Sequence, residues 1–475
     1  MKDNLFKKFM EFGIGSLITL LLGFITSPII TRIISPENNG KFSMFNTVTN
    51  LLMVIVVLGL DQSYVRYYYE EEEENRGKLL RECIKLPIII NIVAGIFIII
   101  FYKSISLYIV EERSISVSFL LIINLLFSTV SRFALLQVRM QQRAKLYSLL
   151  NILLKILNLF FVLLIFLIYN NNYMTLILAM LFTNIIVTVI AIILERKEWM
   201  KKGNLQLRTS NSEILKYGLP LVFSMAMTWI FQSIDRVTIK EFCGYEQVGL
   251  YSGAMTIIAL LNAVQSTFTT FWTPVAFERY SINPNDKEFF SKINEIVVVG
   301  MLIIAIGLIS CKDLIVLLLG SKYREAVFIF PYLVFMPIMY TISETTVLGI
   351  NFKKKPKYHI NISIISAAFN LIGNLILVPR FGAIGAAIST GLAYIVFFSI
   401  RTYFSIKLYK VNYNLKKFAI ITILVYVLAA YSSFYRFNLV ILILAIINIF
   451  TLVILYRDVF IELFNLMQNK LKNRN

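Results

Sequence analysis

The sequence predicts an all-α membrane protein with about fourteen transmembrane helices. Of its 475 residues, 58% are hydrophobic and only 15% are charged, and the mean hydropathy is +0.75. These values lie far outside the range of soluble domains. The apolar runs are continuous rather than alternating, and many approach the ~20 residues that a helix needs to cross a bilayer. Helices are therefore expected to satisfy every backbone group within the lipid.

An internal repeat organises the chain. The turn at residues 35–43, SPENNGKFS, resembles the turn at residues 244–252, GYEQVGLYS. Four pairs of residues match at one offset: Glu37 with Glu246, Gly40 with Gly249, Phe42 with Tyr251, and Ser43 with Ser252. Chance similarity between two membrane turns is the alternative. Repeated helix sets are typical of transporters built from two lobes, and we expect the lobes at residues 1–205 and 206–410, followed by 411–475.

The positions of the apolar runs predict the topology. Spans are expected at residues 12–34, 43–62, 84–102, 116–138, 147–169, 173–194, 214–235, 249–273, 294–311, 328–351, 359–378, 382–404, 417–434 and 438–456. An even number of spans places both termini on one side. The segments on that side carry about three times as many Lys and Arg residues as the others. Both termini are therefore expected in the cytoplasm, and the first span is expected to be retained rather than cleaved.

Composition excludes several other classes of site. The net charge of +19 lies in loops, so nucleic acid is not an expected partner. Cys83, Cys243 and Cys311 show no spacing that predicts a disulfide framework or a zinc site. The acidic run at residues 70–74 is interpreted as a solvated cytoplasmic face, with a regulatory or cation-binding role as the alternative.

Several segments carry a family resemblance. They are ISPENNG (34–40), LGLDQSYVRYY (58–68), and in the second half LKYGLPLVFS, SIDRVTIKEF, VGLYSGA and FGAIGAAISTGLAY. From about residue 9 to 409, the chain resembles bacterial polysaccharide biosynthesis proteins of the oligosaccharide flippase (Wzx-like) type. Their superfamily also contains multidrug and toxin extrusion transporters and the lipid II flippase.

The resemblance implies a fold and a function. The expected fold has two six-helix lobes around a V-shaped central cavity, plus two C-terminal helices. The expected function is transfer of undecaprenyl-pyrophosphate-linked oligosaccharide from the cytoplasmic to the outer leaflet of the bacterial cell membrane, for capsule, O-antigen or exopolysaccharide synthesis. Expected partners are this lipid-linked cargo, membrane lipids, and a polysaccharide polymerase with other biosynthetic membrane proteins.

Cations within spans are the candidate binding residues. Charges there cost about 2.5 to 3.5 kcal/mol on insertion scales and usually mark function. Arg132 in the fourth span and Lys155 in the fifth are both expected roughly 10 to 12 Å from the inner surface. If both face a cavity, they suit an entering pyrophosphate; alternatively each reaches the inner headgroups or a loop carboxylate. Arg32, at the outer end of the first span, is a candidate to receive the head group or an anchor in outer headgroups.

Other polar residues within spans suggest coupling and sugar contact. Glu344 in the tenth span is a candidate coupling site for H⁺ or Na⁺, or a structural partner of a cation in the other lobe. Apart from this ion, no cofactor or metal is expected. Asn370 and Asn374 lie one turn apart and share a helix face. Hydrogen bonding between helices is the default explanation for them, and sugar contact is the alternative.

Acidic and basic residues at two span ends are candidate gates. Asp61 and Arg66 end the second span, and Asp235 and Arg236 end the seventh. Alternating access needs contacts that hold one end shut and break in the other state. Ordinary ion pairs at helix ends are the alternative.

Two other functions would require different residues. A cation-coupled multidrug efflux transporter would favour acidic and aromatic residues in the cavity, whereas two cations and one carboxylate within the membrane favour an anionic cargo. A membrane glycosyltransferase or polysaccharide polymerase would need a sizeable catalytic loop or a phosphate-binding Gly-rich loop, and the sequence contains neither. The protein is therefore expected not to be an enzyme.

Overall fold

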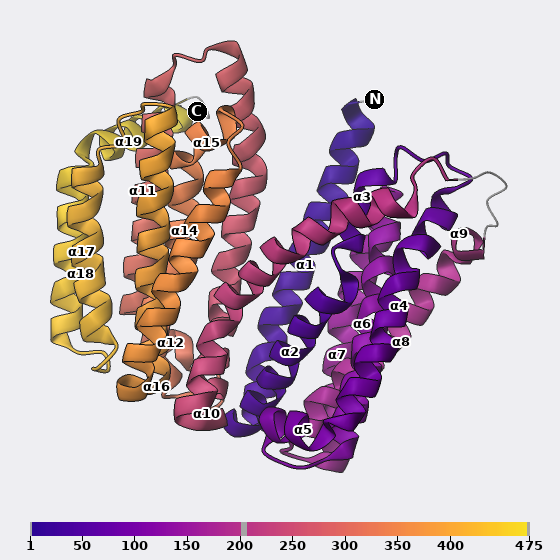
Figure 1. Cartoon of the computed structure of the whole chain (residues 1–475). Helices are drawn as coiled ribbons and strands as arrows, with labels where there is room; N and C mark the ends of the chain where they lie inside the picture. Colours follow the sequence, from indigo (N-terminus) through magenta and orange to yellow (C-terminus); the bar gives the residue numbers. More distant parts are fainter. Residues whose placement is uncertain (1, 201–206, 473–475) are drawn as a thin grey trace. The chain divides into compact units, whose positions relative to one another are not determined.

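A computed structural model describes residues 2–200 and 207–472 (Figure 1). Throughout these ranges the regular structure is helical, with no strand. The helices in chain order are α1 (Lys2–Ile33), α2 (Pro36–Val57), α3 (Leu60–Tyr67), α4 (Arg76–Ile100), α5 (Tyr102–Val110), α6 (Ile115–Met140), α7 (Ala144–Tyr169), α8 (Tyr173–Leu194), α9 (Arg196–Met200), α10 (Asn211–Ile282), α11 (Lys287–Ser310), α12 (Lys312–Val316), η1 (Ser321–Tyr323), α13 (Ala326–Leu333), α14 (Phe335–Thr346), α15 (Leu348–Phe352), α16 (Lys357–Leu408), α17 (Leu415–Ser432), α18 (Leu439–Leu455) and α19 (Arg457–Lys472).

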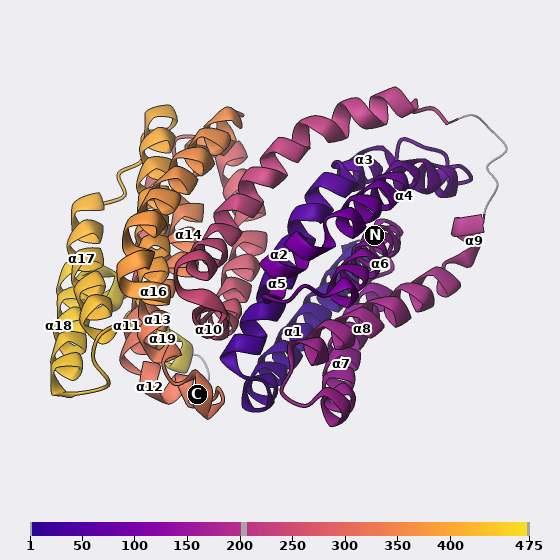
Figure 2. The ribbon, with the colours of Figure 1, turned by 60° about the horizontal axis from the view of Figure 1, so that its bottom comes forward.

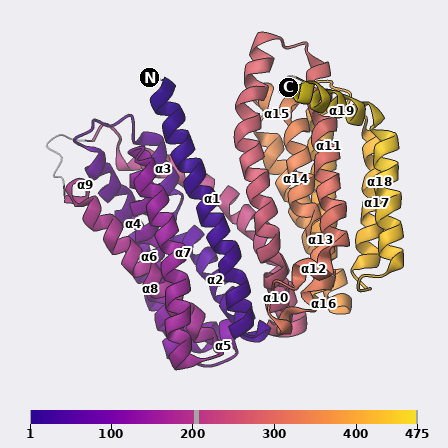
Figure 3. The ribbon, with the colours of Figure 1, turned by 180° about the vertical axis from the view of Figure 1, so that it is seen from behind.

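The chain divides into two compact units, Met1–Val237 and Thr238–Asn475, here called unit 1 and unit 2. In unit 1, α1 packs along α7, and α7 along α8, as the view from behind also shows (Figure 3). In unit 2, α17 and α18 pack together against α11 (Figure 2). The predicted lobe boundary at residues 205/206 lies outside the described residues.

The described helices confirm the predicted fold class. Eleven are long and apolar enough to cross a membrane. Two of these, α10 and α16, each join two helices across a glycine with a positive φ, Gly244 (φ 78°) and Gly382 (φ 58°). With the 17-residue apolar helix α18, the described part of the chain has the fourteen apolar helices that the sequence predicts. These are the features of a multi-pass membrane protein.

Two predicted spans are less regular than expected. The second span, predicted to reach residue 62, ends at Val57, because Leu58 (φ 52°) and Gly59 (φ 70°) both adopt left-handed backbone conformations. A Cβ on Gly59 would lie 2.4 Å from the carbonyl oxygen of Gly218, so this bend also brings two backbones into contact. The tenth span, predicted as one helix over 328–351, consists of α13, α14 and α15.

The internal repeat is visible in the helix boundaries. The residues that separate the first two helices of each half, Ser35 and Gly244, are 209 positions apart. Four further pairs begin 210 to 213 positions apart: α4 and α11, α5 and α12, α6 and α13, α7 and α16. The two halves therefore share one order of helices.

A pair of equivalent hydrogen bonds extends this repeat to side chains. In unit 1, Asn38 Oδ1 accepts a hydrogen bond from the Tyr173 N–H at 3.2 Å. In unit 2, Gln247 Oε1 accepts one from the Ala383 N–H at 3.3 Å. The amides are 209 positions apart and the two donors 210. Each carboxamide thus links the second helix of its half to the first residue of the sixth.

Polar side chains within the units connect helices, and large apolar side chains face outward. Asn91 Nδ2 donates to Thr129 Oγ1 at 3.0 Å between α4 and α6, and Asn294 Nδ2 donates to Thr345 Oγ1 at 2.7 Å between α11 and α14. The outward residues on α18 include Ile443, Ile446, Ile447, Phe450 and Ile454. This arrangement suits a lipid environment, where interhelical hydrogen bonds add specificity to packing.

Candidate functional site

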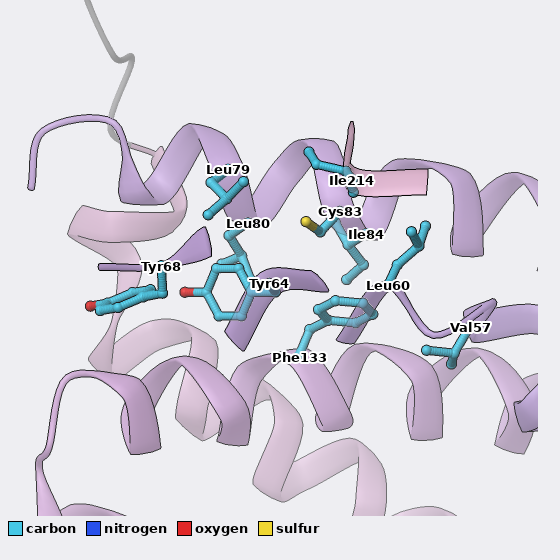
Figure 4. Close-up of a cluster of buried hydrophobic side chains, with 10 residues drawn as sticks. All are labelled: Val57, Leu60, Tyr64, Tyr68, Leu79, Leu80, Cys83, Ile84, Phe133 and Ile214. Carbon is cyan, nitrogen blue, oxygen red and sulfur yellow. The ribbon is translucent and has the colours of Figure 1, made fainter. Parts of the chain in front are cut away.

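A buried apolar cluster fixes one end of unit 1 (Figure 4). It contains Val57, Leu60, Tyr64, Tyr68, Leu79, Leu80, Cys83, Ile84, Phe133 and Ile214. Two cluster members, Leu60 on α3 and Phe133 on α6, each neighbour a charged residue in the sequence. Because both are fully buried, they fix the backbone positions of Asp61 and Arg132.

Asp61 and Arg132 form an ion pair with an asymmetric environment. Arg132 Nε and Nη2 lie 2.8 and 2.5 Å from Asp61 Oδ2, and Gln62 Nε2 donates to the same oxygen at 2.9 Å. The Asp61 side chain is 2% exposed, whereas that of Arg132 is 40% exposed. The carboxylate therefore holds the guanidinium in place, and the remaining N–H groups of Arg132 face outward. Such a fork of donors matches the oxygens of a phosphate.

Lys155 and Arg32 are both exposed side chains. Lys155 is on α7, about 16 Å along the axis from its first residue, whereas Arg132 is about 12 Å from the end of α6. Within the described ranges, Lys155 and Arg32 form neither a hydrogen bond nor an ion pair. The structure thus pairs Arg132 with Asp61.

The candidate gate residues lie in different surroundings. Arg66 forms an ion pair with Glu70, four residues later, rather than with Asp61, which is paired with Arg132. Asp235 and Arg236 were predicted to end the seventh span, but the helix continues to Gly244. Asp235 is buried there, and Arg236 Nη1 donates to the Gln232 carbonyl at 3.3 Å. The first helical part of α10 ends only at Gly244, where the backbone leaves the helical conformation (φ 78°).

Glu344 is buried beside an arginine of its own unit. Arg401 Nη1, on α16, lies 2.8 Å from Glu344 Oε1 and 2.6 Å from Ser343 Oγ. The Arg401 side chain is 7% exposed and that of Glu344 is 8% exposed. The guanidinium also lies 5.4 Å from the ring of Tyr340 and 5.3 Å from that of Phe397. A coupling ion at Glu344 would have to compete with this arginine.

Sequence reasoning missed Arg401. It lies inside the predicted span 382–404, but three residues from the end, where a cation is typically able to reach the headgroups. The helix instead extends to Leu408, so the side chain lies inside unit 2. Its place within a predicted span was the only available signal.

Asn370 and Asn374 belong to a buried network within α16. Asn374 Nδ2 donates to the Asn370 carbonyl at 2.9 Å, and Ser389 Oγ donates to Asn370 Oδ1 at 2.8 Å. A Cβ on Gly373 would lie 2.3 Å from Ser389 Oγ, so the two parts of α16 pack closely here. These contacts are of the interhelical type expected by default.

Metal-ligating groups are sparse in the described part of the chain. No group of three or more His, Cys, Asp or Glu side chains there is arranged to hold a metal ion. Cys83, Cys243 and Cys311 are free thiols.

Comparison with known proteins identifies relatives that match most of the chain. The family model described as polysaccharide biosynthesis protein matches residues 5–280. The capsular polysaccharide biosynthesis protein CapF of Staphylococcus aureus is 22% identical over 402 residues, which cover 82% of this chain and 96% of CapF. An uncharacterized membrane protein of Methanocaldococcus jannaschii is 24% identical over 435 residues and covers 85% of each chain.

Solved structures share the fold at low sequence identity. The lipid II flippase MurJ, in an inward closed conformation, has a TM-score of 0.71 and 18% identity, covering 94% of this chain and 99% of MurJ. An inward-facing multidrug resistance transporter of the MATE family, in the MOP superfamily, has a TM-score of 0.58 and 13% identity over 82% of this chain and 93% of its own. The helix arrangement is therefore that of this group of membrane proteins.

Proposed function

Because the chain belongs to the polysaccharide biosynthesis protein family, we propose that it is a flippase for lipid-linked oligosaccharides. The cargo would be an undecaprenyl-pyrophosphate-linked oligosaccharide, transferred from the cytoplasmic to the outer leaflet by alternating access. The role is transport rather than catalysis. Its product would serve polymer assembly for a capsule, O-antigen or exopolysaccharide, with a polysaccharide polymerase as a downstream partner in the bacterial cell membrane.

The Asp61–Arg132 pair is the observation that carries this proposal. A pyrophosphate is anionic, and a route through hydrocarbon requires a cation to replace part of its hydration. Arg132 presents a half-exposed guanidinium, and its buried carboxylate partner occupies only the Nε and Nη2 side. A phosphate oxygen can therefore bind the outward N–H groups while Asp61 still holds the side chain.

The proposed topology places both termini in the cytoplasm. The excess of Lys and Arg on that side supports it. Arg132 then lies in the cytoplasmic half of α6, where cargo enters from the inner leaflet. Lys155, exposed in the cytoplasmic half of α7, is the second cation of this half, and Arg32 at the opposite end of α1 is the proposed contact after translocation.

Coupling and gating roles remain part of the proposal. Glu344 is the proposed carboxylate that binds H⁺ or Na⁺. Because Arg401 is already paired with Glu344, the ion would have to displace or rearrange this arginine. Asp61 is the proposed gating residue in unit 1, because its ion pair with Arg132 joins α3 to α6 and would have to break in another state of the transport cycle. Gating roles are also proposed, from their positions alone, for Asp235, Arg236 and Arg66. Sugar contact is proposed for Asn370 and Asn374, in a state in which the two parts of α16 separate.

The proposal is tested by leaflet accessibility in proteoliposomes. Vesicles containing an undecaprenyl-pyrophosphate-linked oligosaccharide and the protein are exposed to a glycosidase that cannot cross the bilayer. Arg132→Ala removes hydrogen bonds to a charged group, worth about 1.5 to 3 kcal/mol, so the initial rate should fall by roughly 10- to 150-fold. The initial rate should fall less in Lys155→Ala, because the lysine ammonium that it removes is a single point charge.

Arg113→Ala is the matched control. Arg113 is exposed in the turn before α6, at the other end of that helix from the proposed site. This variant should flip at the wild-type rate. If the wild-type protein moves no lipid-linked sugar but expels a cationic dye, the function is multidrug efflux and the assignment of Arg132 fails.

A further inference from the structure

A second cationic site lies at the end of unit 2 that carries α12. Figures 1 and 3 show α12 and the turn between α17 and α18 at this end. A cavity of about 480 Å³ lies between them, lined by Arg324, Arg436, Asp313, Leu314, Leu317 and Phe437 among others. This volume is within the range of small-ligand sites. None of these residues belongs to the Asp61–Arg132 site.

The acidic residue of the cavity already has partners within the protein. Asp313 Oδ2 accepts a hydrogen bond from the Phe437 N–H at 3.0 Å and lies 3.2 Å from Lys312 Nζ. Lys312 is fully buried, and its ammonium lies 5.2 Å from the centre of the Phe328 ring. Burial lowers the pKa of Lys312, and the Asp313 carboxylate opposes that shift. Asp313 therefore joins α12 to the α17–α18 turn and is paired with Lys312.

The two arginines keep most of their hydrogen-bonding capacity. Arg324 Nη1 donates to the Val316 carbonyl at 3.2 Å, which anchors one arm of the guanidinium beside the cavity. Arg436 Nη2 lies 3.6 Å from Glu325 Oε1, and both side chains are more than 60% exposed. An ion pair this long and this exposed contributes little. The cavity thus has an excess of positive charge with free N–H donors.

The rim of the cavity is apolar and exposed. Leu314 and Leu317 project from α12 and its end, and Phe437 projects from the facing turn. All three are large side chains with about half or more of their surface exposed. A ligand that carries a phosphate and hydrocarbon chains would satisfy both the arginines and this rim.

We propose that this cavity binds the phosphate of an anionic membrane phospholipid between Arg324 and Arg436, with its acyl chains against Leu314, Leu317 and Phe437. The bound lipid would join α12 to the α17–α18 turn, as the hydrogen bond from the Phe437 N–H to Asp313 also does. This inference does not depend on the flippase proposal, because the ligand is a bulk lipid.

Native mass spectrometry of the full-length protein in detergent tests the site. Phosphatidylglycerol is titrated against phosphatidylcholine, which has the same chains but no net charge. The wild-type protein should bind one phosphatidylglycerol about tenfold more tightly than phosphatidylcholine. The double variant Arg324→Gln/Arg436→Gln should lose this preference. Arg436→Gln alone should lose part of it without affecting the fold, because the side chain has only the weak contact with Glu325.

Arg380→Gln is the matched control. Arg380 is an exposed cation at the end of the first part of α16 and does not line the cavity. It should keep the full preference. Equal binding of the two lipids by the wild type, or an unchanged preference in the double variant, would overturn the proposal. Binding of inorganic phosphate as tight as that of phosphatidylglycerol would also overturn it, because the acyl chains would then contribute nothing. Tighter binding of undecaprenyl pyrophosphate at the same site would overturn it as well.

Discussion

Removing the Glu344 carboxylate should destabilise the protein more than removing its arginine partner. Both side chains are less than 10% exposed, so either single change leaves a charge in the interior. Breaking such a buried pair costs about 3 to 5 kcal/mol. In Glu344→Ala the remaining charge is Arg401, which cannot lose its proton. Its Nε already has no hydrogen-bond partner, and only Ser343 and two aromatic rings remain around the guanidinium.

The reverse change leaves a group that can adapt. In Arg401→Met, Glu344 can take up a proton and become neutral, which reduces the cost to that of an incompletely bonded polar group, about 1 to 3 kcal/mol. The methionine also fills part of the space between Tyr340 and Phe397. The double variant Glu344→Gln/Arg401→Met contains no buried charge and should be close in stability to Arg401→Met alone.

Thermal unfolding in detergent, followed by circular dichroism, compares these variants. The wild type should have the highest unfolding midpoint and Glu344→Ala the lowest. The double variant and Arg401→Met should lie between them. A double variant with a midpoint at or below that of Glu344→Ala would show that the two residues do not act as a pair. A midpoint for Arg401→Met at or below that of Glu344→Ala would refute the argument about the trapped guanidinium.

Three further predictions concern unit 1 and the repeat. Gly59→Ala should lower the unfolding midpoint, because its Cβ would meet a carbonyl oxygen at 2.4 Å, whereas Gly300→Ala, with open space around the new Cβ, should leave the midpoint unchanged or raise it. Equal effects would disprove the close contact. Asn38→Ala removes hydrogen bonds to Ser35, Asn171 and Tyr173 and should cost about 1 to 3 kcal/mol, more than Gln247→Ala, at about 0.5 to 1.5 kcal/mol. A larger loss in Gln247→Ala would contradict this comparison. Asp61→Asn keeps the shape of the side chain but leaves buried amide hydrogens without acceptors, so it should cost about 1 to 3 kcal/mol in the same assay. A wild-type midpoint would show that the Asp61 charge is dispensable for stability.

The sequence predicted the helical class, the number of apolar helices and the repeat, because continuous apolar runs and turn residues are local signals. Gly244 lies within the predicted turn, and Ser35 precedes the equivalent helix at the predicted offset. The bend at Gly59 was missed because it depends on the approach of another backbone, that of Gly218, which no local pattern encodes.

Candidate site residues could be named from the sequence, but their partners could not. Arg132 stood out as a cation within a span, yet its pairing with Asp61 connects residues 71 positions apart. Glu344 was recognisable, but Arg401 resembled an ordinary residue near a helix end. Partner choice depends on which helix faces pack together, and an isolated sequence does not fix those faces.

The most direct test of the proposed function is the rate at which the wild-type protein exposes an undecaprenyl-pyrophosphate-linked oligosaccharide, compared with a neutral lipid that carries the same sugar. Both lipids are measured in the same proteoliposomes with the same external glycosidase, with Arg132→Ala in parallel. The account predicts rapid exposure of the pyrophosphate lipid by the wild type only, and little exposure of the neutral lipid. Equal rates for both lipids, unaffected by Arg132→Ala, would contradict a cationic site for an anionic cargo.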